Sequence, residues 1–370
     1  MKVLHIASFR GNIGDNLSHL GFAKILESLN VIAEIDRVEI RKFYKNYDGV
    51  DKCFFDRKFI DTMNRYDLVV IGGGGFFDFW VEGSVTGTTI DMDPDLIKTI
   101  KIPTIFASIG SHPHRKVPIG NEDKFKRFFS ELVQNENIYV GLRNDGSIKV
   151  LQELFGEDVT KWDQVDEILD NAFFCGDGLE ERKALYPAPY IAINITSDQL
   201  EMASSRRGDI NRKDYVHAMS RFIERQAEDF NIVFVPHIYS DLEAIYQVLT
   251  ALGQSVIRNR VSVAPCVQGD NGSLEALSIY RDSELVVASR FHANVGPLAV
   301  GSKVMGLAVL DRVAYLYNSL ALNDRYVEVG KNLEAELLTK ARKVLAQDFN
   351  CGELKVKREE SLCFYGNIIS

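Results

Sequence analysis

Three observations predict an α/β protein built from two Rossmann-like domains that face each other across a cleft. Short apolar strands alternate with helical patterns along most of the 370 residues, which is typical of parallel sheets with crossover helices. A chain of this length is too long for one ordinary core and suits two domains. Residues 66–73 and 283–290 are also alike, because each is an apolar strand that opens into a turn of small or polar residues.

The composition is that of an acidic globular protein, with 46% hydrophobic residues, 26% charged residues and a formal net charge of −9. We therefore expect no nucleic-acid partner, and an anionic ligand would have to be held by local positive groups. The 5 cysteines are scattered without metal-ligand spacing, which favours reduced thiols in the cytoplasm and predicts no metal site. We expect no signal peptide, and no apolar run is long enough to span a bilayer.

The first domain is expected over residues 1–180. Its buried strands are apolar runs that end at polar or glycine-rich turns, and they are expected at residues 3–7, 67–71, 104–109 and 138–142. Helices are expected at residues 17–29 and 125–133 and after Ser147. Asp93 followed by Pro94 predicts another helix start, since Asp is a good N-cap and Pro fits the first helical position.

The second domain is expected over residues 181–345. The pattern weakens between residues 157 and 189, which places the domain boundary near residues 178–187. Strands are expected at residues 190–195, 232–235, 261–263, 285–288 and 303–309. Helices are expected at residues 215–230, 241–252, 273–280 and 333–345. Residues 346–370 are expected to form a C-terminal tail.

Residues 284–299 carry the strongest functional signal in the chain. A buried strand ends there at Ser289, Arg290 and His292, and small or apolar residues spaced three to four apart then predict a helix. Arginine and histidine beside the free N–H groups of a helix amino terminus make an anion site. The structural alternative is that Arg290 pairs with a carboxylate and that His292 is a core histidine. Two such residues at the end of one parallel strand favour the anion site.

Four glycines at residues 72–75 follow another predicted buried strand. Without Cβ atoms, Gly73 and Gly74 would let a ligand approach the backbone N–H groups closely. The run lacks the spacing of a dinucleotide or phosphate loop, and a tight turn in a crowded place explains glycine equally well. Asp78 and Trp80 just beyond it favour a ligand, because a carboxylate with an aromatic ring is a common way to hold a sugar.

Polar residues at other strand ends indicate the same kind of site. Asn12 and Asp15 follow the first strand and are expected at the sheet edge that carries the glycine run, although an isolated Asp such as Asp15 more often caps the adjacent helix. Arg143 stands at that edge in the first domain. His237, with Asp241 four residues later, stands at the matching edge of the second domain.

Five segments, in this order and at this spacing, resemble the polysaccharide pyruvyl transferase family, whose architecture is similar to that of two-domain GT-B glycosyltransferases. They are Gly11-Asn-Ile-Gly-Asp15, Gly72-Gly-Gly-Gly-Phe-Phe-Asp78, Leu142-Arg-Asn-Asp-Gly-Ser147, Val235-Pro-His237 and Ser289-Arg-Phe-His292. The resemblance covers roughly residues 1–326. Phe291 replaces the family's leucine, and Asn144 replaces its usual aspartate. Residues 310–312 replace a Tyr-x-x-Lys stretch, which leaves the role of Arg312 open.

The resemblance implies that phosphoenolpyruvate is the donor and that the product is a sugar carrying pyruvate as a ketal across two hydroxyls. It implies catalytic roles for Arg143, Arg290 and His292, since arginines bind phosphate and carboxylate groups through two N–H bonds and imidazoles exchange protons near neutral pH. The donor-binding residues would be Arg143, His237, Ser289, Arg290, His292 and Arg312. The acceptor-binding residues would be Asn12, Asp15, Gly73, Gly74 and Asp78. No metal or cofactor is implied beyond phosphoenolpyruvate as co-substrate.

Two other functions fit the sequence. A GT-B glycosyltransferase would hold a nucleotide-sugar in the second domain, with Arg290 on its diphosphate, and a catalytically silent sugar-binding module would use the same cleft. The acceptor would be a sugar, an oligosaccharide or a lipid-linked saccharide, and the last of these would bring the protein to the inner face of the membrane. We expect a cytoplasmic protein, and the sequence makes no prediction of its oligomeric state.

Overall fold

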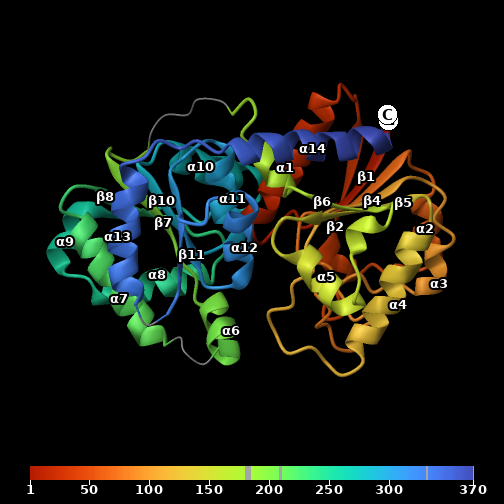
Figure 1. Cartoon of the computed structure of the whole chain (residues 1–370), viewed down its shortest axis with the longest axis horizontal. Helices are drawn as coiled ribbons and strands as arrows, with labels where there is room; N and C mark the ends of the chain where they lie inside the picture. The colour runs from red at the N-terminus through yellow and green to blue at the C-terminus, as the bar shows by residue number, and fades with distance from the viewer. Residues whose placement is uncertain (180–184, 208–210, 331, 370) are drawn as a thin grey trace. The chain divides into compact units, whose positions relative to one another are not determined.

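The computed structural model describes residues 1–179, 185–207, 211–330 and 332–369. Contacts divide the chain into two compact units, of which the first comprises Met1–Phe9, Gly21–Asn171 and Lys355–Ser370, and the second comprises Arg10–Leu20 and Ala172–Leu354. Each unit is a six-stranded sheet with helices, so the predicted α/β fold class is confirmed for each unit by itself (Figure 1). The arrangement of the two across a cleft stays a prediction.

The first unit is built on six parallel strands in the order β2-β1-β3-β4-β5-β6. These strands are β1 (Lys2–Ala7), β2 (Glu34–Glu39), β3 (Leu68–Gly72), β4 (Thr104–Ile109), β5 (Ile138–Arg143) and β6 (Val165–Ile168). The four inner strands are buried apolar runs at the predicted places. The sequence does not predict the two edge strands, because β2 has no fully buried residue and β6 is buried only at Val165 and Ile168.

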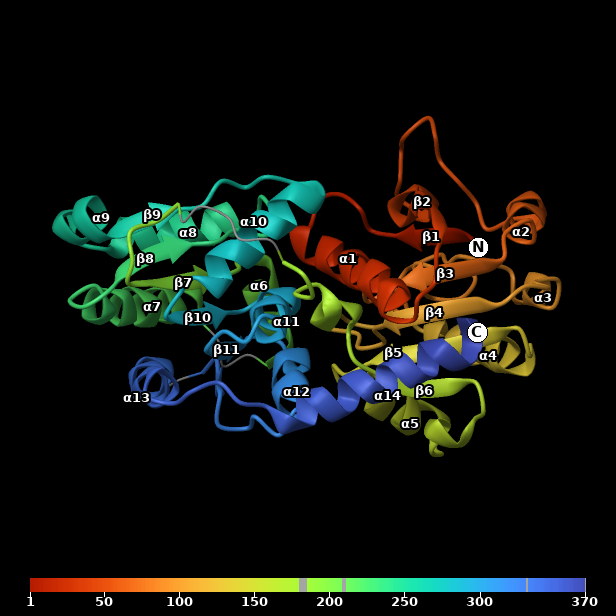
Figure 2. The same cartoon turned by 90° about the horizontal axis from the view of Figure 1, so that it is seen from above.

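Helices cover both faces of the first sheet. One core combines side chains of the strands with side chains of helices on one face. The helices on that face are α2 (Arg57–Met63), α3 (Pro94–Ile97), α4 (Asn121–Gln134) and α5 (Ser147–Phe155). On the other face lie the last part of α1 (Ile13–Ser28) and the C-terminal helix α14 (Gly352–Ile369) (Figure 2). There, the ring of Phe22 on α1 lies 5.1 Å from that of His5 on β1 and 5.9 Å from that of Tyr365 on α14.

The second unit repeats this plan with six parallel strands in the order β12-β11-β10-β7-β8-β9. The strands are β7 (Tyr190–Asn194), β8 (Asn231–Phe234), β9 (Val261–Val263), β10 (Leu285–Ala288), β11 (Val304–Ala308) and β12 (Tyr326–Glu328). The helices are α6 (Asp198–Arg207), α7 (Arg212–Gln226), α8 (Asp241–Ala251), α9 (Gln254–Arg260), α10 (Gly269–Arg281), α11 (Phe291–Ala299), α12 (Asp311–Ser319) and α13 (Leu333–Leu345). Short 3-10 helices in the chain are η1 (Ile40–Phe43), η2 (Val159–Lys161) and η3 (Asn171–Phe174).

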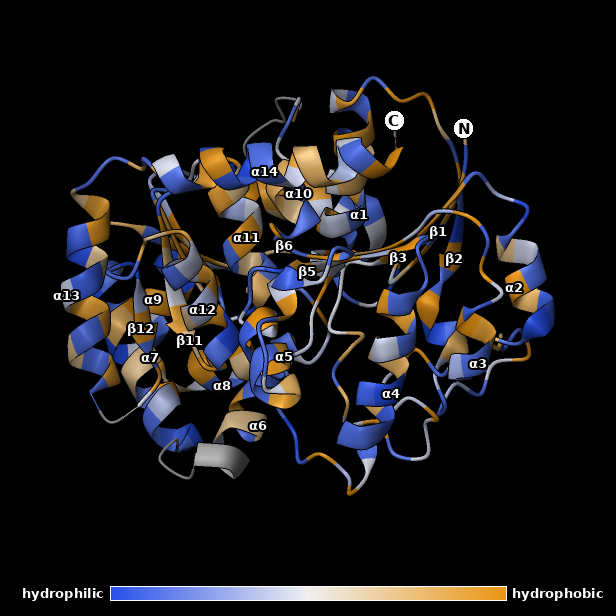
Figure 3. Cartoon of the chain, turned by 45° about the vertical axis from the view of Figure 1, so that its right-hand side comes forward, coloured by the Kyte–Doolittle hydropathy of each residue, from blue (hydrophilic) through white to orange (hydrophobic). Residues whose placement is uncertain are grey.

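The helices of the second unit form two layers. Helices α7, α8 and α13 pack on one face of the sheet, where they share one core with the strands, and α10, α11 and α12 pack together on the other. The hydropathy colours fit this burial in both units, since hydrophobic colours run along strands such as β1 and β3, whereas α4 and α13 carry hydrophilic stretches (Figure 3). No helix among the described residues is long and apolar enough to cross a membrane.

The strand order of the second sheet determines where a ligand would bind. Strands β7 and β10 are neighbours, but the chain proceeds from β7 towards β8 on one side and from β10 towards β11 on the other. The two connections therefore diverge at the carboxyl ends of β7 and β10. Open α/β sheets bind their ligands in the crevice at such a switch point.

The contact units differ from the predicted domains at three places. The change between units falls at Asn171 and Ala172 rather than at residues 180 and 181. Residues 346–370 are not a free tail, because α14 buries Phe364 and Tyr365 and belongs to the first unit from Lys355 onwards. Residues 10–20 belong with the second unit, although they follow a strand of the first sheet.

Candidate functional site

The turns at the switch point of the second sheet bring several predicted site residues together. Thr196 and Asp198 follow β7, His237 follows β8, and Ser289 and Arg290 follow β10. All of these side chains except that of Asp198 are buried. Polar groups withdrawn from water at a strand edge need partners, and their bonds determine what the site can do.

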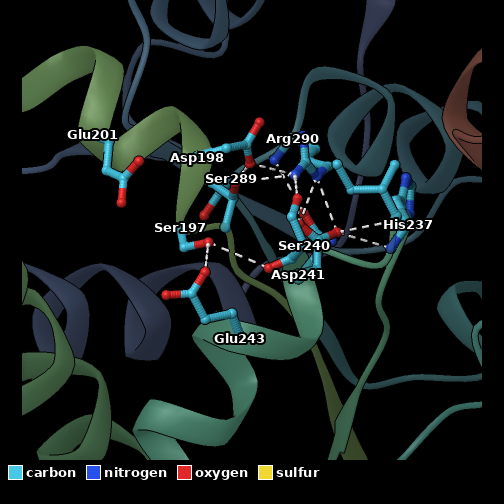
Figure 4. Close-up of polar contacts among 12 residues, drawn as sticks. Ser197, Asp198, Glu201, His237, Ser240, Asp241, Glu243, Ser289 and Arg290 are labelled. Carbon is cyan, nitrogen blue, oxygen red and sulfur yellow. Dashed lines mark hydrogen bonds and ion pairs between the residues drawn. The ribbon is translucent and has the colours of Figure 1, made fainter.

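Arg290 is the central residue of this site. Its Nε atom donates to both carboxylate oxygens of Asp241, at 2.8 and 2.9 Å, and its Nη2 atom donates to Oδ1 of the same residue at 2.6 Å. Nη2 also donates to Oδ1 of Asp198 at 2.6 Å and to the hydroxyl of Thr196 at 3.1 Å. Figure 4 shows the two carboxylates on different sides of the guanidinium group. Arg290 is therefore held in one orientation.

We call Arg290 with its partners Asp198 and Asp241 the Arg290 group. Its ion pairs keep Arg290 protonated and Asp198 ionised. Burial opposes the charge of Arg290, but Asp241 and Asp198 outweigh burial and raise the pKa of the guanidinium above its ordinary value. Burial likewise opposes the charge of Asp198, yet Arg290 and the Thr196 hydroxyl lower the pKa of that carboxyl. The structural alternative for Arg290, pairing with a carboxylate, is thus observed. An anion site would have to use the N–H groups that remain.

His292 lies in the first turn of α11 and faces the beginning of α1. Its Nδ1 atom is 3.5 Å from Oδ1 of Asp15, which also accepts a hydrogen bond of 2.9 Å from the side-chain amide of Asn12. A side chain at Gly14 would place its Cβ 2.6 Å from Cβ of His292, so glycine is required for this approach. Asn12 and Asp15 therefore lie beside His292 in the second unit.

His237 is fully buried and contacts the hydroxyl of Tyr280 through Nε2, at 2.7 Å. Burial, together with the charges of Arg290 and His292, lowers the pKa of His237 well below its ordinary value, whereas burial raises that of Tyr280. Both groups are therefore neutral. The direction of the hydrogen bond between His237 and Tyr280 depends on the imidazole tautomer. The backbone N–H of His237 donates to Asp241 at 2.9 Å, which ties it to the Arg290 group.

Ser289 and Arg312, two predicted donor-binding residues of the second unit, follow β10 and β11. Ser289 is fully buried, and its hydroxyl lies 3.4 Å from that of Tyr215 on the inner side of α7. Arg312 is half-buried on α12, after β11. Ser289 thus acts in packing the turn.

The glycine run in the first unit packs closely against its surroundings. A Cβ at Gly72 would lie 1.8 Å from the carbonyl oxygen of Ala107, and Gly73 has a φ of 79°, in the left-handed region. A Cβ at Gly74 would meet the ring of Phe76 at 2.7 Å. These contacts support the tight-turn explanation for the run.

Asp78 ties the glycine run to the next loop. Its Oδ1 atom accepts a hydrogen bond of 2.6 Å from the backbone N–H of His112, and the residue is 4% exposed. The imidazoles of His112 and His114 are stacked with their centroids 4.7 Å apart, and Arg115 lies 5.1 Å above the ring of Trp80. The ring of Trp80, whose centroid lies 6.3 Å from that of His114, is therefore part of a histidine-rich cluster.

Arg143 is also buried, in the first unit. Its Nε atom donates to Oδ2 of Asp145 at 2.6 Å, and Nη1 lies 3.9 Å from Oδ2 of Asp170. The flanking carboxylates outweigh burial and raise the pKa of Arg143. Gly110 permits this placement, since a Cβ there would be 2.6 Å from Nη2. The two predicted catalytic arginines thus lie in different units, and each is paired within its own.

Comparison with known families decides what kind of protein carries this site. The family model described as polysaccharide pyruvyl transferase matches residues 12–311. The chain belongs to the polysaccharide pyruvyl transferase family. The match includes every predicted site residue except Arg312, which lies one position beyond it. No curated protein sequence gives a significant match.

Solved structures with a fold similar to that of this pyruvyl transferase family member include two UDP-GlcNAc 2-epimerases. The UDP-GlcNAc 2-epimerase from Methanocaldococcus jannaschii has a TM-score of 0.56 at 12% identity, covering 99% of this chain and 100% of that one. The UDP-GlcNAc 2-epimerase from Neisseria meningitidis, bound to UDP-GlcNAc, has a TM-score of 0.56 at 11% identity and covers 100% of both chains. At such low identity the likeness shows the fold alone, which is GT-B-like.

Sequence reasoning missed three residues of the site in this family member. Thr196 and Asp198 follow a strand that the sequence predicts, so reading the turn after every strand would have found them. Tyr280 lies inside a predicted helix, and no local pattern distinguishes it from a core tyrosine. Asp241 was noted only as a neighbour of His237, and its bond to Arg290 spans 49 positions.

Proposed function

We propose that the protein transfers the enolpyruvyl group of phosphoenolpyruvate to two hydroxyls of a sugar, in a polysaccharide or its precursor, and forms a pyruvate ketal. The observation that carries the proposal is the rigid placement of Arg290 between β10 and the start of α11, with His292 two residues later. The family match supports the transferase class. Phosphoenolpyruvate use, ketal formation and the acceptor are our inference.

Arg290 is suited to bind an anionic donor. Asp241 fixes its orientation through three hydrogen bonds, so little conformational entropy is lost when a ligand binds. Its Nη1 atom makes no hydrogen bond with any residue that the structure describes. The first N–H groups of α11, which has no side-chain cap, add donors of the kind that bind phosphate and carboxylate oxygens.

His292 is suited to move the proton that starts the reaction. Asp15 contacts Nδ1 and orients the imidazole, and histidines oriented in this way are common acids and bases. His292 would deliver a proton to the methylene carbon of phosphoenolpyruvate, and C2 would gain oxocarbenium character. Neutral His237 beside the Arg290 group would help to orient the substrate rather than serve as an acid.

The remaining steps balance without a cofactor. One sugar hydroxyl forms a bond to C2 and gives up its proton, which restores the proton that His292 delivered. The bond between C2 and the phosphate oxygen then breaks, and phosphate leaves. The second hydroxyl bonds to C2, and its proton ends on the phosphate. The products are the ketal, with a new methyl group, and inorganic phosphate.

The test is calorimetric titration with phosphoenolpyruvate, beside UDP- and GDP-sugars, on the native chain and two variants. Arg290→Gln removes the proposed anchor, whereas Arg212→Gln removes one positive charge from α7, where Arg212 pairs with Glu201 and Glu243. We expect phosphoenolpyruvate to bind the native chain and Arg212→Gln alike and to lose affinity about 100-fold or more in Arg290→Gln.

Two controls keep this test decisive. If Arg290→Gln unfolds, the double variant Arg290→Gln/Asp241→Asn removes the stranded buried carboxylate as well and serves in its place. Product is then sought by mass spectrometry as a pyruvate ketal, with release of phosphate, on a panel of oligosaccharides. Binding of a nucleotide-sugar without phosphoenolpyruvate would contradict the proposal, as would near-native phosphoenolpyruvate affinity in a folded Arg290 variant.

A further inference from the structure

The two carboxylates that hold Arg290 differ in their surroundings. Asp241 is fully buried, and besides Arg290 it accepts the backbone N–H of His237. The Asp198 side chain is 35% exposed and holds Arg290 through one oxygen, Oδ1, which also accepts a hydrogen bond of 2.5 Å from Thr196. Asp241 is therefore a fixed partner, whereas Asp198 can turn towards solvent.

The two carboxylates occupy different N–H edges of the Arg290 guanidinium group. A carboxylate or phosphate that binds arginine through two oxygens needs two adjacent N–H groups. The edge formed by Nε and Nη2 is taken by Asp241. The edge formed by Nη1 and Nη2 is the other one. Within the described residues Nη1 has no hydrogen-bond partner, but the second N–H of Nη2 is given to Asp198. Asp198 thus occupies half of the edge that an anion would use.

We propose that Asp198 is a displaceable counter-ion that stands in the place of an anionic oxygen of the donor and sets the affinity of the site for anions. When a ligand carboxylate or phosphate binds the Nη1–Nη2 edge, the Asp198 side chain turns out, and the Thr196 hydroxyl donates to the ligand in its stead. The identity of the ligand as phosphoenolpyruvate rests on the proposed function, but the role of Asp198 at an oxyanion site does not.

Charge supports the assignment. With both carboxylates in place, the Arg290 group carries an excess of one negative charge, so an approaching anion is repelled at short range. Removal of the Asp198 charge frees Nη2 and ends that repulsion, while Asp241 still holds Arg290 in position. An uncharged residue at 198 should therefore bind anions more tightly, the opposite of what loss of an ordinary binding residue does.

The α6 helix offers a matched control. Glu201 lies one turn after Asp198 and contacts Arg212 at 2.9 Å, not Arg290 (Figure 4). Asp198→Asn and Glu201→Gln each remove one negative charge from the same helix. Long-range electrostatics would affect both variants similarly and would be screened by salt, whereas displacement from Arg290 affects Asp198→Asn alone.

The experiment is calorimetric titration of the full chain and both variants with phosphoenolpyruvate and, separately, with inorganic phosphate, at low and at moderate salt. We expect Asp198→Asn to lower both dissociation constants about tenfold. Glu201→Gln should change them less than about twofold at moderate salt. In Asp198→Asn the Thr196 hydroxyl is expected to donate to the ligand. Adding Thr196→Val removes that donor and should therefore reverse part of the gain in affinity.

The possible results separate this inference from the proposed function. Unchanged or weaker phosphate binding in Asp198→Asn overturns the inference, and so does loss of turnover at unchanged affinity, which would make Asp198 a catalytic base. Equal gains in Asp198→Asn and Glu201→Gln overturn it as well. If the native chain binds phosphate but never consumes phosphoenolpyruvate, the proposed function fails, and the phosphate titrations still decide the role of Asp198.

Discussion

Asp241 holds Arg290 through both of its carboxylate oxygens, at distances between 2.6 and 2.9 Å, although the two residues are 49 positions apart. The bond joins the start of α8 to the end of β10. His237 is linked to the same pair, because its backbone N–H donates to the Asp241 carboxylate. Binding and stability are therefore coupled at this place, and a variant must be judged on both.

A double-mutant cycle measures that coupling. Arg290→Gln leaves a fully buried Asp241 without its charged partner and should cost about 3–5 kcal/mol of unfolding free energy. Asp241→Asn should cost less, because Asp198 still pairs with Arg290. The double variant should be more stable than the sum of the single changes predicts, with a coupling of about 0.5–3 kcal/mol. Both tryptophans, Trp80 and Trp162, lie in the first unit, so calorimetry rather than tryptophan fluorescence should follow this unfolding. Strict additivity would show that the pair is not coupled.

Arg143 should prove to be a stabilising residue of the first unit. Arg143→Met strands the buried carboxylates of Asp145 and Asp170, both fully buried, and should cost about 3–5 kcal/mol. Arg127→Met is the control, because its side chain is 62% exposed beside Asp95, and should stay within about 0.5 kcal/mol. Urea unfolding followed by tryptophan fluorescence measures both changes. Equal stability of the two variants would contradict the buried-pair account.

His237 should make the second unit sensitive to acid. Its pKa is lowered in the folded state, so below the unfolded value of about 6.5 the unfolded chain binds more protons. The stability contribution of neutral His237 is thus complete above pH 6.5 and is lost as the pH falls, by about 1.4 kcal/mol per unit. His237→Gln should remove this slope, so the stability difference between native and variant chains should shrink from pH 7 to pH 5. Calorimetry at several pH values measures it, and a constant difference would refute the assignment.

His292 should affect turnover more than donor binding. His292→Gln removes the proton donor and should lower kcat about 100- to 10,000-fold while the phosphoenolpyruvate dissociation constant changes little. Asp15→Asn, which only loosens the orientation of the imidazole, should lower kcat less, by about tenfold. His217→Gln, at an exposed position on α7, is the control. A His292 variant with near-native kcat would assign the proton transfer to another group.

Much of the fold could be predicted from the sequence because buried parallel strands leave a plain signal. The strand β10 and the helix α13 have the predicted bounds, since β10 is an unbroken apolar run and α13 has a regular apolar stripe. The edge strands β2 and β6 leave no such signal, because one or both of their faces meet water. Helix α14 was not predicted for a related reason. Its buried residues gather near its end, and they are recognised as apolar contacts only once the first sheet is known.

The candidate site could be predicted where it follows strands and not where it depends on long-range pairing. The ends of β8 and β10 give His237, Arg290 and His292, because parallel strands deliver their carboxyl ends to one edge. The partners that define their chemistry come from elsewhere in the chain. Asp15 contacts His292, although the two residues are 277 positions apart in the sequence. No local pattern indicates that the residues after β1 belong to the second unit.

The route of the chain has a consequence for synthesis. Because the strands of the first unit lie within residues 2–168 and α14 only at residues 352–369, α14 is synthesised after the second unit, and its share of the sheet face, beside the last part of α1, stays uncovered until then. A ribosome releases residues in order, so the second unit can finish folding while the first still awaits its last 16 residues, Lys355–Ser370. Loss of those residues would expose apolar side chains on that face of the first sheet. Quality-control proteases degrade chains that contain such an incompletely packed unit.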